Sequence, residues 1–378
     1  MTSVVEPTQP LLNLGYQLGL IGFTRLSNII RLSHYAIGMH PRYLLRLLLV
    51  VSSSVVSLPL RLAEKIFYGR KITQTQIENP PIFIIGHWRS GTTYLHNLMT
   101  QDPHFGYLSM YQAVVPDCSL IGHNWLRQLL AKIMPIKRPM DNVLWPMEGP
   151  QEDEVALAKV MATGFYTQFL FPSKARHLFR KFVLMEGASA KDADEFKRSY
   201  LQLMKVATIK ADGKPLILKN PVNTARIRLL LELFPDAKFV HIHRSPYDVF
   251  KSASYLHQKL SVLTTLQTID AQRADETVLI LYEEMMQRYL QDRTLIPAGN
   301  LVEVRYEDLE SRPMDIIQRI YSELDLPSFE ENIPIFEAFL EAQKSYQKNN
   351  FSLSAEAKQK VEQHWGFALS EFGYSLPV

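Results

Sequence analysis

The chain divides into stretches with the spacing of amphipathic helices and short runs that are apolar throughout. Up to residue 75, apolar residues occur in clusters that predict helices, with breaks near Pro41 and Pro59. The segment "IFIIG" (82–86) is instead a short apolar run with β-branched residues. Such a run is typical of a strand buried in a parallel sheet.

The residues after this strand continue with helical spacing. Residues 92–101 place two leucines and a methionine on one face, which predicts an amphipathic helix. Residues 105–110 are a candidate for a second strand. From 111 to 214 the chain is interrupted by prolines and then becomes helical, so this segment predicts a helical insertion.

Alternation of strand and helix resumes after residue 214. Three more strands are predicted, each followed by a helical pattern: 215–220, 238–244 and 300–309. Strand–helix units with short turns predict an α/β fold of three layers with a central parallel sheet. In such sheets, ligands bind at the carboxyl ends of the strands. We therefore expect an N-terminal helical segment (1–75) and one catalytic domain (76–378) that includes the helical insertion.

Composition adds limits on function and compartment. The 378 residues carry a net charge of only +3, which does not indicate a nucleic-acid partner. The single cysteine, Cys118, forms no disulfide within the chain and fits a reducing compartment, so we expect a cytoplasmic protein. "VPDCSL" has no catalytic signature, and Cys118 is predicted to be a small apolar filler.

The N-terminal segment is basic and apolar. Residues 1–71 hold eight Lys and Arg against two Glu, a net charge of +6. The uncharged run Leu47–Leu60 is shorter than the roughly 18 residues that span a bilayer, and no signal-peptide pattern precedes it. Two interpretations stay open: a helix packed on the catalytic domain, or a segment in peripheral contact with a membrane surface.

The loop after the first strand, "GHWRSGTT" (86–93), has the residues of an anion site. Its glycines let backbone N–H groups face an anion at the start of a helix, where the helix dipole adds positive charge. Arg89 supplies a forked cation for oxyanions. A P-loop of ATP-binding proteins has Lys where this chain has Thr92. A plain glycine turn is the alternative.

The motif "RSGTT" after a buried strand resembles the 5′-phosphosulfate loop of sulfotransferases that use 3′-phosphoadenosine 5′-phosphosulfate (PAPS). The resemblance implies that Arg89 lies near the bridging and sulfuryl oxygens. It also implies that four residues wrap the 5′-phosphate: Ser90, Gly91, Thr92 and Thr93. It further implies a P-loop-like fold.

A second motif, "HRSPYDVFKS", ends the strand at 238–244. Arg244 ends the strand and Ser252 follows eight residues later on a helix, so that both side chains can bind one phosphate. An ion pair of Arg244 with Asp248 is the alternative. The motif is similar to the family's 3′-phosphate site. "VEVRYEDL" resembles a third landmark of the family, in which we expect Tyr306 to be structural.

Departures from the family pattern indicate the branch. The C-terminal "RKGxxGDWK" of the cytosolic branch is missing, and Asn220 stands where that branch has a catalytic histidine, next to the retained Lys219. The chain therefore resembles the bacterial and carbohydrate-type branches. This implies transfer of a sulfuryl group from PAPS to a hydroxyl of a small molecule, either lipid-like or a sugar. The residues indicate neither the acceptor nor the oligomeric state.

The transfer needs a base that takes the proton of the acceptor. The resemblance favours Glu152, at the start of a predicted helix, followed by Glu154 and then by His123 or His87. Acidic residues at this position also complement a helix dipole, which is the structural alternative. Lys219 is expected to stabilise charge on the sulfuryl group. No cluster of metal-ligand residues is present in the sequence, and none is expected.

Two other classes of function compete with this interpretation. A P-loop kinase or NTPase needs a lysine at position 92 and an aspartate for magnesium, and this lysine is missing. A non-catalytic anion-binding protein at a membrane surface would use the basic N-terminus and the loop. It has no use for the spacing between Arg244 and Ser252.

Overall fold

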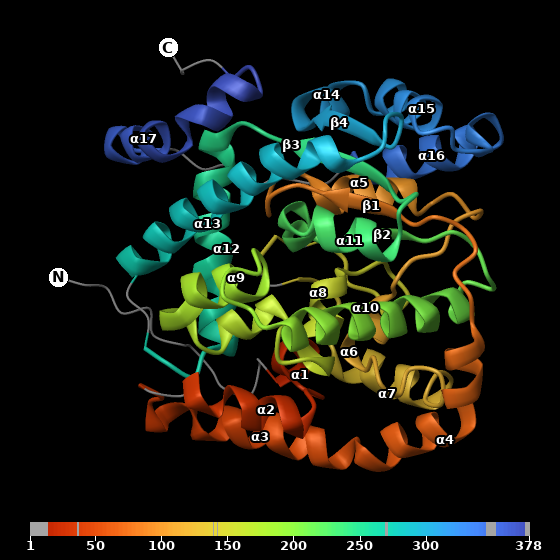
Figure 1. Ribbon diagram of the computed structural model, residues 1–378, viewed down its shortest axis with the longest axis vertical. Helices are drawn as coiled ribbons and strands as arrows, with labels where there is room; N and C mark the ends of the chain where they lie inside the picture. Colours follow the sequence, from red (N-terminus) through yellow and green to blue (C-terminus); the bar gives the residue numbers. More distant parts are fainter. Residues whose placement is uncertain are drawn as a thin grey trace. The chain divides into compact units, whose positions relative to one another are not determined.

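The structure is a computed structural model that describes residues 14–35, 38–138, 140–141, 143–268, 271–344 and 353–374. The chain forms two compact units (Figure 1). The first, which we call the helical unit, consists of Met1–Ile77, Leu108–Gly213 and Leu256–Thr277. The second, which we call the sheet unit, consists of Glu78–Tyr107, Lys214–Tyr255 and Val278–Val378.

The elements of the helical unit are α1 (Leu14–Leu20), α2 (Leu26–Leu32), η1 (Ser33–Tyr35), η2 (Pro41–Tyr43), α3 (Leu44–Val56), α4 (Leu58–Gln74), α6 (Met110–Val114), α7 (Trp125–Ile133), α8 (Asp153–Val160), η3 (Phe165–Phe169), η4 (Pro172–Lys174), α9 (Ala175–Phe182) and α10 (Ala190–Lys210). Those of the sheet unit are β1 (Ile82–Ile85), α5 (Thr92–Met99), β2 (Ile217–Lys219), η5 (Pro221–Ala225), α11 (Ile227–Leu233), β3 (Lys238–His243), η6 (Arg293–Leu295), β4 (Leu301–Arg305), α14 (Tyr306–Ser311), α15 (Pro313–Glu323), α16 (Phe329–Gln343) and α17 (Ala355–Glu371). Two helices continue from one unit into the other, α12 (Pro246–Thr264) and α13 (Ala271–Asp292).

The four strands form one parallel sheet in the order β2-β1-β3-β4. β1 lies between two neighbours: Ile84 is in register with Lys219 of β2 and with Val240 of β3. All four residues of β1 are buried, which explains why this strand is apolar at every position and does not alternate.

Helices pack on both faces of the sheet and make three layers (Figure 1). On one face, Ile82 and Ile84 belong to a core with Leu95 of α5 and with residues of α15 and α16. On the other face, Phe83 meets the ring of Phe234, which follows α11. The predicted three-layer α/β fold with a central parallel sheet is confirmed, as are the strands predicted at 82–86, 215–220 and 238–244. The strand predicted at 300–309 is confirmed up to Arg305, where α14 begins instead.

The strand predicted at residues 105–110 is wrong. Gly106 forms only an isolated bridge to Leu216. The chain then turns into α6, because Ser109 and Gln112 form a capping box in which each side chain bonds to the backbone of the other. The helical start signal therefore outweighs the apolar run that precedes it.

The break predicted near Pro59 is only one residue long. α3 ends at Val56, Ser57 keeps helical dihedral angles, and Pro59 lies at the start of α4, where a proline is tolerated. The resulting stretch, Pro41–Gln74, has 34 residues and is the one described stretch with the length and composition to cross a membrane. A third of its most apolar window (33%) is buried within the protein.

Gly86 provides a test of the sheet geometry. Its φ is +139°, and a Cβ placed on it would lie 2.2 Å from the carbonyl oxygen of Ile242 in β3. We expect Gly86→Ala to lower the free energy of unfolding by about 3 kcal/mol or more, because backbone would have to move. Gly366→Ala, in α17 with no atom near the new methyl group, should raise it by about 0.5–1 kcal/mol. Urea denaturation compares the two variants, and a Gly86→Ala protein as stable as the wild type would contradict this packing.

Candidate active site

The carboxyl ends of all four strands carry residues that the sequence motifs single out. Lys219 is the last residue of β2, the loop 86–91 follows β1, Arg244 follows β3 and Tyr306 follows β4. Because the strands are parallel and adjacent, these positions share one edge of the sheet. The order of the strands reverses at β1, and such switch points are where α/β sheets bind ligands.

The loop after β1 has a strained backbone. Gly91 has φ +95°, and Arg89, which is not a glycine, has φ +73°. A Cβ on Gly91 would lie 2.2 Å from the ring of Tyr306, so only glycine fits at this position. Left-handed backbone at a residue such as Arg89 costs about 1–3 kcal/mol and concentrates at functional sites.

The two candidate phosphate motifs meet in the structure. Arg89 Nε donates a hydrogen bond to Ser252 Oγ over 2.8 Å. Ser252 lies in α12, which begins at Pro246 directly after the β3 strand. The basic residue of the first motif and the hydroxyl of the second are thus in direct contact.

Arg244 lies on an aromatic surface. Its guanidinium carbon is 4.7 Å from the centroid of the Tyr306 ring, a cation–π contact. Asp248 is 3.5 Å away, so the ion pair considered as the alternative is present, but the Asp248 side chain is 54% exposed and such pairs contribute little. Arg244 Nε is buried and has no hydrogen-bond partner within the described residues. This N–H is a donor for an anion.

Lys219 is buried at the end of β2 beside the start of α5. Its Nζ lies 3.4 Å from Thr93 Oγ1, so the ammonium group is next to a hydroxyl of the loop motif. His96 lies near by, and burial, together with the charge of Lys219, lowers the pKa of its imidazole to about 3. His96 is therefore neutral at ordinary pH and serves packing.

The candidate base Glu152 lies in the helical unit as the residue before α8. It is partly exposed, and its carboxylate accepts a hydrogen bond from the hydroxyl of Tyr166. Glu154 is completely buried and accepts from the backbone N–H of Phe165, which begins η3. Glu152 is therefore accessible enough to act as a base. Glu154 is buried and its hydrogen bond to the backbone of Phe165 indicates a structural role.

The two histidine candidates have other contacts. His87 is buried, its ring is 4.8 Å from that of Tyr282, and its Nδ1 lies 2.8 Å from the carbonyl oxygen of Trp88. His123 Nε2 lies 2.6 Å from Lys210 Nζ, and burial and this cation lower the pKa of His123. Both histidines are used within their own units.

The lone cysteine has the surroundings of a packing residue. Cys118 is buried in an apolar cluster, and burial raises the pKa of its thiol to about 12, which fits a filler and not a nucleophile. Across the residues that the structure describes, no group of three or more His, Cys, Asp or Glu could hold a metal ion.

Two contacts at this edge were not predicted from the sequence. Tyr306, expected to be structural, lies against the guanidinium of Arg244 and limits position 91 to glycine. Thr224 Oγ1 accepts a 2.7 Å hydrogen bond from the N–H of Gly86 and so holds the first turn of the loop. The motif marked Tyr306 but not its contacts, and nothing in the sequence near Thr224 marks its contact.

Comparisons with known proteins agree on one family. A profile described as "Sulfotransferase family" matches residues 80–331. The chain is 32% identical over 321 residues to omega-hydroxy-beta-dihydromenaquinone-9 sulfotransferase Stf3 of Mycobacterium tuberculosis and of Mycobacterium bovis. These alignments cover 85% of this chain and 82% of the relative.

Solved structures support the fold. Sulfotransferase STF9 from Mycobacterium avium superposes with a TM-score of 0.63 at 23% identity, over 84% of this chain and 82% of that chain. Sulfotransferase STF1 from Mycobacterium tuberculosis gives a TM-score of 0.63 at 18% identity, over 95% of this chain and 99% of that chain.

The different surroundings of the two glutamates can be tested by stability. Glu154→Ala removes a buried acceptor of a backbone N–H and leaves a cavity, so we expect a loss of about 2–4 kcal/mol in the free energy of unfolding. Glu152→Ala should cost no more than about 1 kcal/mol, because its carboxylate is partly exposed. Denaturant titration of the two variants measures the difference. Equal losses would contradict the assignment of a structural role to Glu154 alone.

Proposed function

The chain belongs to the sulfotransferase family, and from this premise we propose that its sulfuryl donor is PAPS and its acceptor is the hydroxyl of a lipid-like alcohol. The single observation that supports the donor best is the hydrogen bond of 2.8 Å between Arg89 and Ser252. It joins a loop suited to a 5′-phosphosulfate with a helix suited to a 3′-phosphate. PAPS is a nucleotide that carries both groups.

The proposal assigns the 5′-phosphosulfate to the loop after β1. The N–H groups at the start of α5 have no acceptor one turn earlier in the helix, and the helix dipole adds positive charge there. Hydroxyl donors accompany them: Ser90, Thr92 and Thr93. Gly91 leaves room for this close approach, and Arg89 adds the forked cation.

The proposal assigns the 3′-phosphate to Arg244 and Ser252. Arg244 has its guanidinium over the ring of Tyr306 and a buried Nε without a hydrogen-bond partner among the described residues. A phosphate oxygen would satisfy this donor. Burying a donor without a partner costs about 1–3 kcal/mol, so binding would recover free energy that the fold has spent.

The chemistry follows from charge. During in-line transfer, negative charge grows on the leaving phosphate and stays on the sulfuryl oxygens, and fixed cations stabilise it. Lys219 and Arg89 are the cations that we assign to this role. We assign the base to Glu152, which takes the proton of the acceptor hydroxyl as the oxygen attacks sulfur. Glu154, which we considered for the same task, is better suited to holding η3.

The acceptor class is supported by a relative and by composition. The curated relative that covers most of this chain is named for a menaquinone carrying a terminal hydroxyl, which is a lipid. The basic, apolar N-terminal segment agrees with a lipid-like acceptor. A sugar acceptor is the alternative. We propose that the protein is cytoplasmic and reaches its lipid acceptor at a membrane surface.

The donor proposal predicts a specific effect of Arg244. Isothermal calorimetry should give tighter binding of 3′,5′-ADP than of ATP with magnesium. Arg244→Ala should weaken 3′,5′-ADP by roughly 30–150-fold, from the loss of a charged hydrogen bond worth about 2–3 kcal/mol, and leave 5′-AMP unchanged. Arg305→Ala is the matched control, because Arg305 also ends a strand of the sheet but lies over Tyr374.

Other outcomes of this titration have clear meanings. Tight binding of ATP with magnesium and none of 3′,5′-ADP would replace the proposal by a P-loop kinase. Equal weakening by Arg244→Ala and Arg305→Ala would mean that general positive charge, and not a 3′-phosphate site, determines affinity.

The acceptor and the base can be tested together. With ³⁵S-labelled donor and a total lipid extract, we expect the label in the organic phase after the wild-type reaction. Glu152→Gln should lower kcat by about 10²- to 10⁴-fold, the range for loss of a general base, with 3′,5′-ADP affinity unchanged. Label found only in water-soluble sugars would reject the lipid acceptor, and an unchanged kcat would reject Glu152 as the base.

A further inference from the structure

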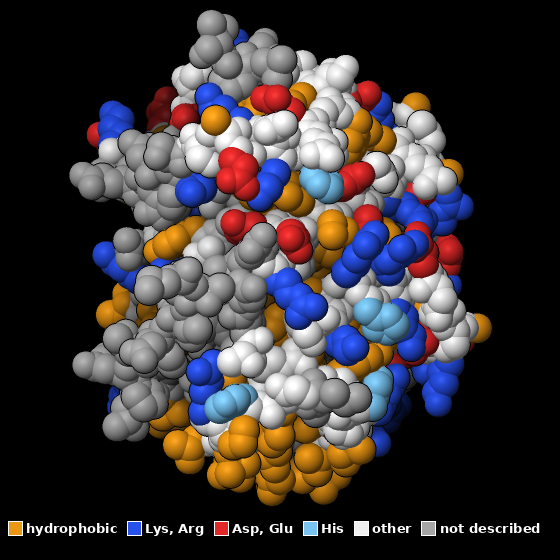
Figure 2. Space-filling view, turned by 90° about the vertical axis from the view of Figure 1, so that its left-hand side faces the viewer, with side chains coloured by type: hydrophobic (Ala, Val, Ile, Leu, Met, Phe, Trp, Pro, Cys, Tyr) orange, Lys and Arg blue, Asp and Glu red, His pale blue; other side chains and the backbone are white. Residues whose placement is uncertain are grey.

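The α3–α4 helix pair turns many large apolar side chains outward, unlike an ordinary surface helix. Its outward side carries nine exposed large apolar side chains: Leu44, Leu45, Leu48, Val55, Val56, Leu58, Leu62, Ile66 and Phe67. Leu45 and Phe67 are 76% and 72% exposed. Figure 2 shows hydrophobic side chains gathered at the lower end of the view, where α3 runs in Figure 1. A group of exposed large apolar side chains on one surface marks an interaction site.

The side that faces the rest of the helical unit carries polar contacts beside the buried Val50 and Ile72. Ser53 Oγ accepts from the N–H of Phe23 over 3.0 Å. Glu64 is buried, and its Oε2 accepts from the N–H groups of Leu120 and Ile121 over 2.8 and 3.0 Å. Arg61 donates to the carbonyl of Phe23. Serine, glutamate and arginine therefore contribute to attaching this helix pair to the protein, while nine of its large apolar side chains point away from it.

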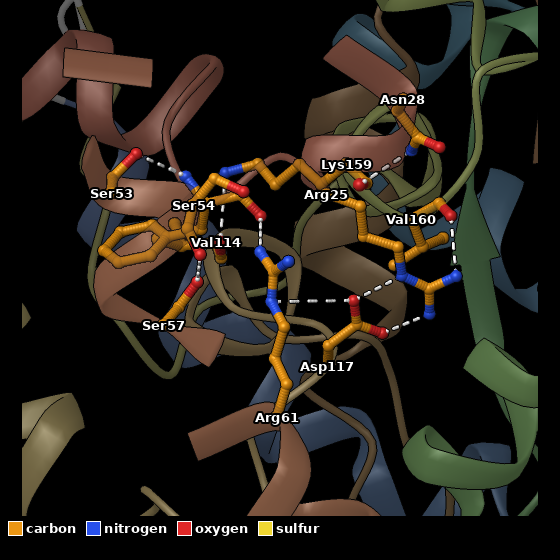
Figure 3. A network of polar contacts seen from close by, with 11 residues as sticks. Arg25, Asn28, Ser53, Ser54, Ser57, Arg61, Val114, Asp117, Lys159 and Val160 are labelled. Atoms are coloured by element: carbon orange, nitrogen blue, oxygen red, sulfur yellow. Dashed lines mark hydrogen bonds and ion pairs between the residues drawn. The ribbon is translucent and has the colours of Figure 1, made fainter. Parts of the chain in front are cut away.

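The polar attachments continue into a buried network (Figure 3). Arg61 lies 3.9 Å from Asp117, which forms a closer pair with Arg25. Lys159 is buried, and its Nζ donates to the carbonyl oxygens of Gly19 and Val114 over 2.7 and 3.1 Å. Separating α3–α4 from the protein would leave the N–H groups of Phe23, Leu120 and Ile121 without their side-chain acceptors, so the helix pair stays attached.

This attachment decides between spanning a membrane and lying on it. The stretch Pro41–Gln74 has the length of a membrane-spanning helix. A spanning helix would be surrounded by lipid, whereas this one is covered by protein along its polar side. The outward apolar side alone is accessible, which is the geometry of a helix lying in the plane of the interface.

Helix α7 adds to the same apolar surface. Three of its large apolar side chains are exposed: Trp125, Leu129 and Ile133. The buried side of α7 packs through Leu126 and Leu130 in a cluster against which Leu60 of α4 also packs. Tryptophan is enriched where a protein meets the headgroup region of a bilayer.

The exposed charges on α3 and α4 are positive. Within Pro41–Gln74 the only carboxylate is Glu64, which is buried, while Lys65, Arg70 and Lys71 are exposed. We propose that the outward face of α3, α4 and α7 docks onto the surface of a lipid bilayer that contains anionic lipids. The apolar side chains enter the headgroup boundary and the cations bind the headgroups. Docking needs no sulfuryl donor, so the inference does not depend on the proposed function.

Vesicle sedimentation of the full chain tests this. With phosphatidylcholine vesicles containing about 30% phosphatidylglycerol, we expect the wild type to pellet with the vesicles. The variant Leu45→Gln/Phe67→Gln should bind at least about tenfold more weakly. Neutralising Lys65, Arg70 and Lys71 to Gln should weaken binding by roughly fivefold for each cation, and only on anionic vesicles. Thermal denaturation checks that the variants fold.

The matched control is Leu295→Gln/Ile335→Gln, which removes two exposed apolar side chains of the sheet unit and should leave binding unchanged. An absence of wild-type binding to anionic vesicles would overturn the proposal. So would unchanged binding of Leu45→Gln/Phe67→Gln. If ultracentrifugation instead gives a dimer that this variant dissociates, without vesicle binding, the face is an interface between two copies and the proposal is wrong.

Discussion

The candidate donor site depends on the parallel pairing of β1 with both of its neighbours. β2 lies on one side and β3 on the other, with Ile84 in register with residues of both. Because all three strands run in one direction, they deliver their following residues to one edge. Lys219, the loop after β1 and Arg244 are thereby neighbours, although they are far apart in the sequence.

Within this frame, two close approaches limit what the loop can do. Gly86 lies against the carbonyl of Ile242, and Gly91 lies against the ring of Tyr306. Neither contact leaves room for a side chain, so the backbone of the loop is held before any ligand arrives. Preorganised donors of this kind stabilise charge without reorganising at the moment of reaction. The strained φ of Arg89 is compatible with such a held loop.

The sheet and the site loop could be predicted because their signals are local. A buried parallel strand is apolar at every residue, and a glycine after it marks a turn. The strand and loop at residues 82–91 could therefore be predicted from their local sequence alone. The contacts of Thr224 with Gly86 and of Tyr306 with Arg244 join residues distant in sequence, and no local pattern reports them. At residues 105–110 the apolar run predicted a strand, but the capping box of Ser109 starts a helix there. The residues assigned to the donor, the base and the sulfuryl group remain predictions.

Helical periodicity has a limit that α3 and α4 illustrate. A pattern such as "LLLVVSSSVVSLPL" says that a helix has an apolar and a polar side, but not which side faces the protein. The usual assignment places leucine inside and serine outside. Here three partly buried donors outside the helix pair, the N–H groups of Phe23, Leu120 and Ile121, need acceptors. Satisfying them turns serine and glutamate inward, because an unpaired buried N–H costs more than an exposed leucine. The apolar side is then left facing outward, where only an apolar or interfacial environment removes it from water.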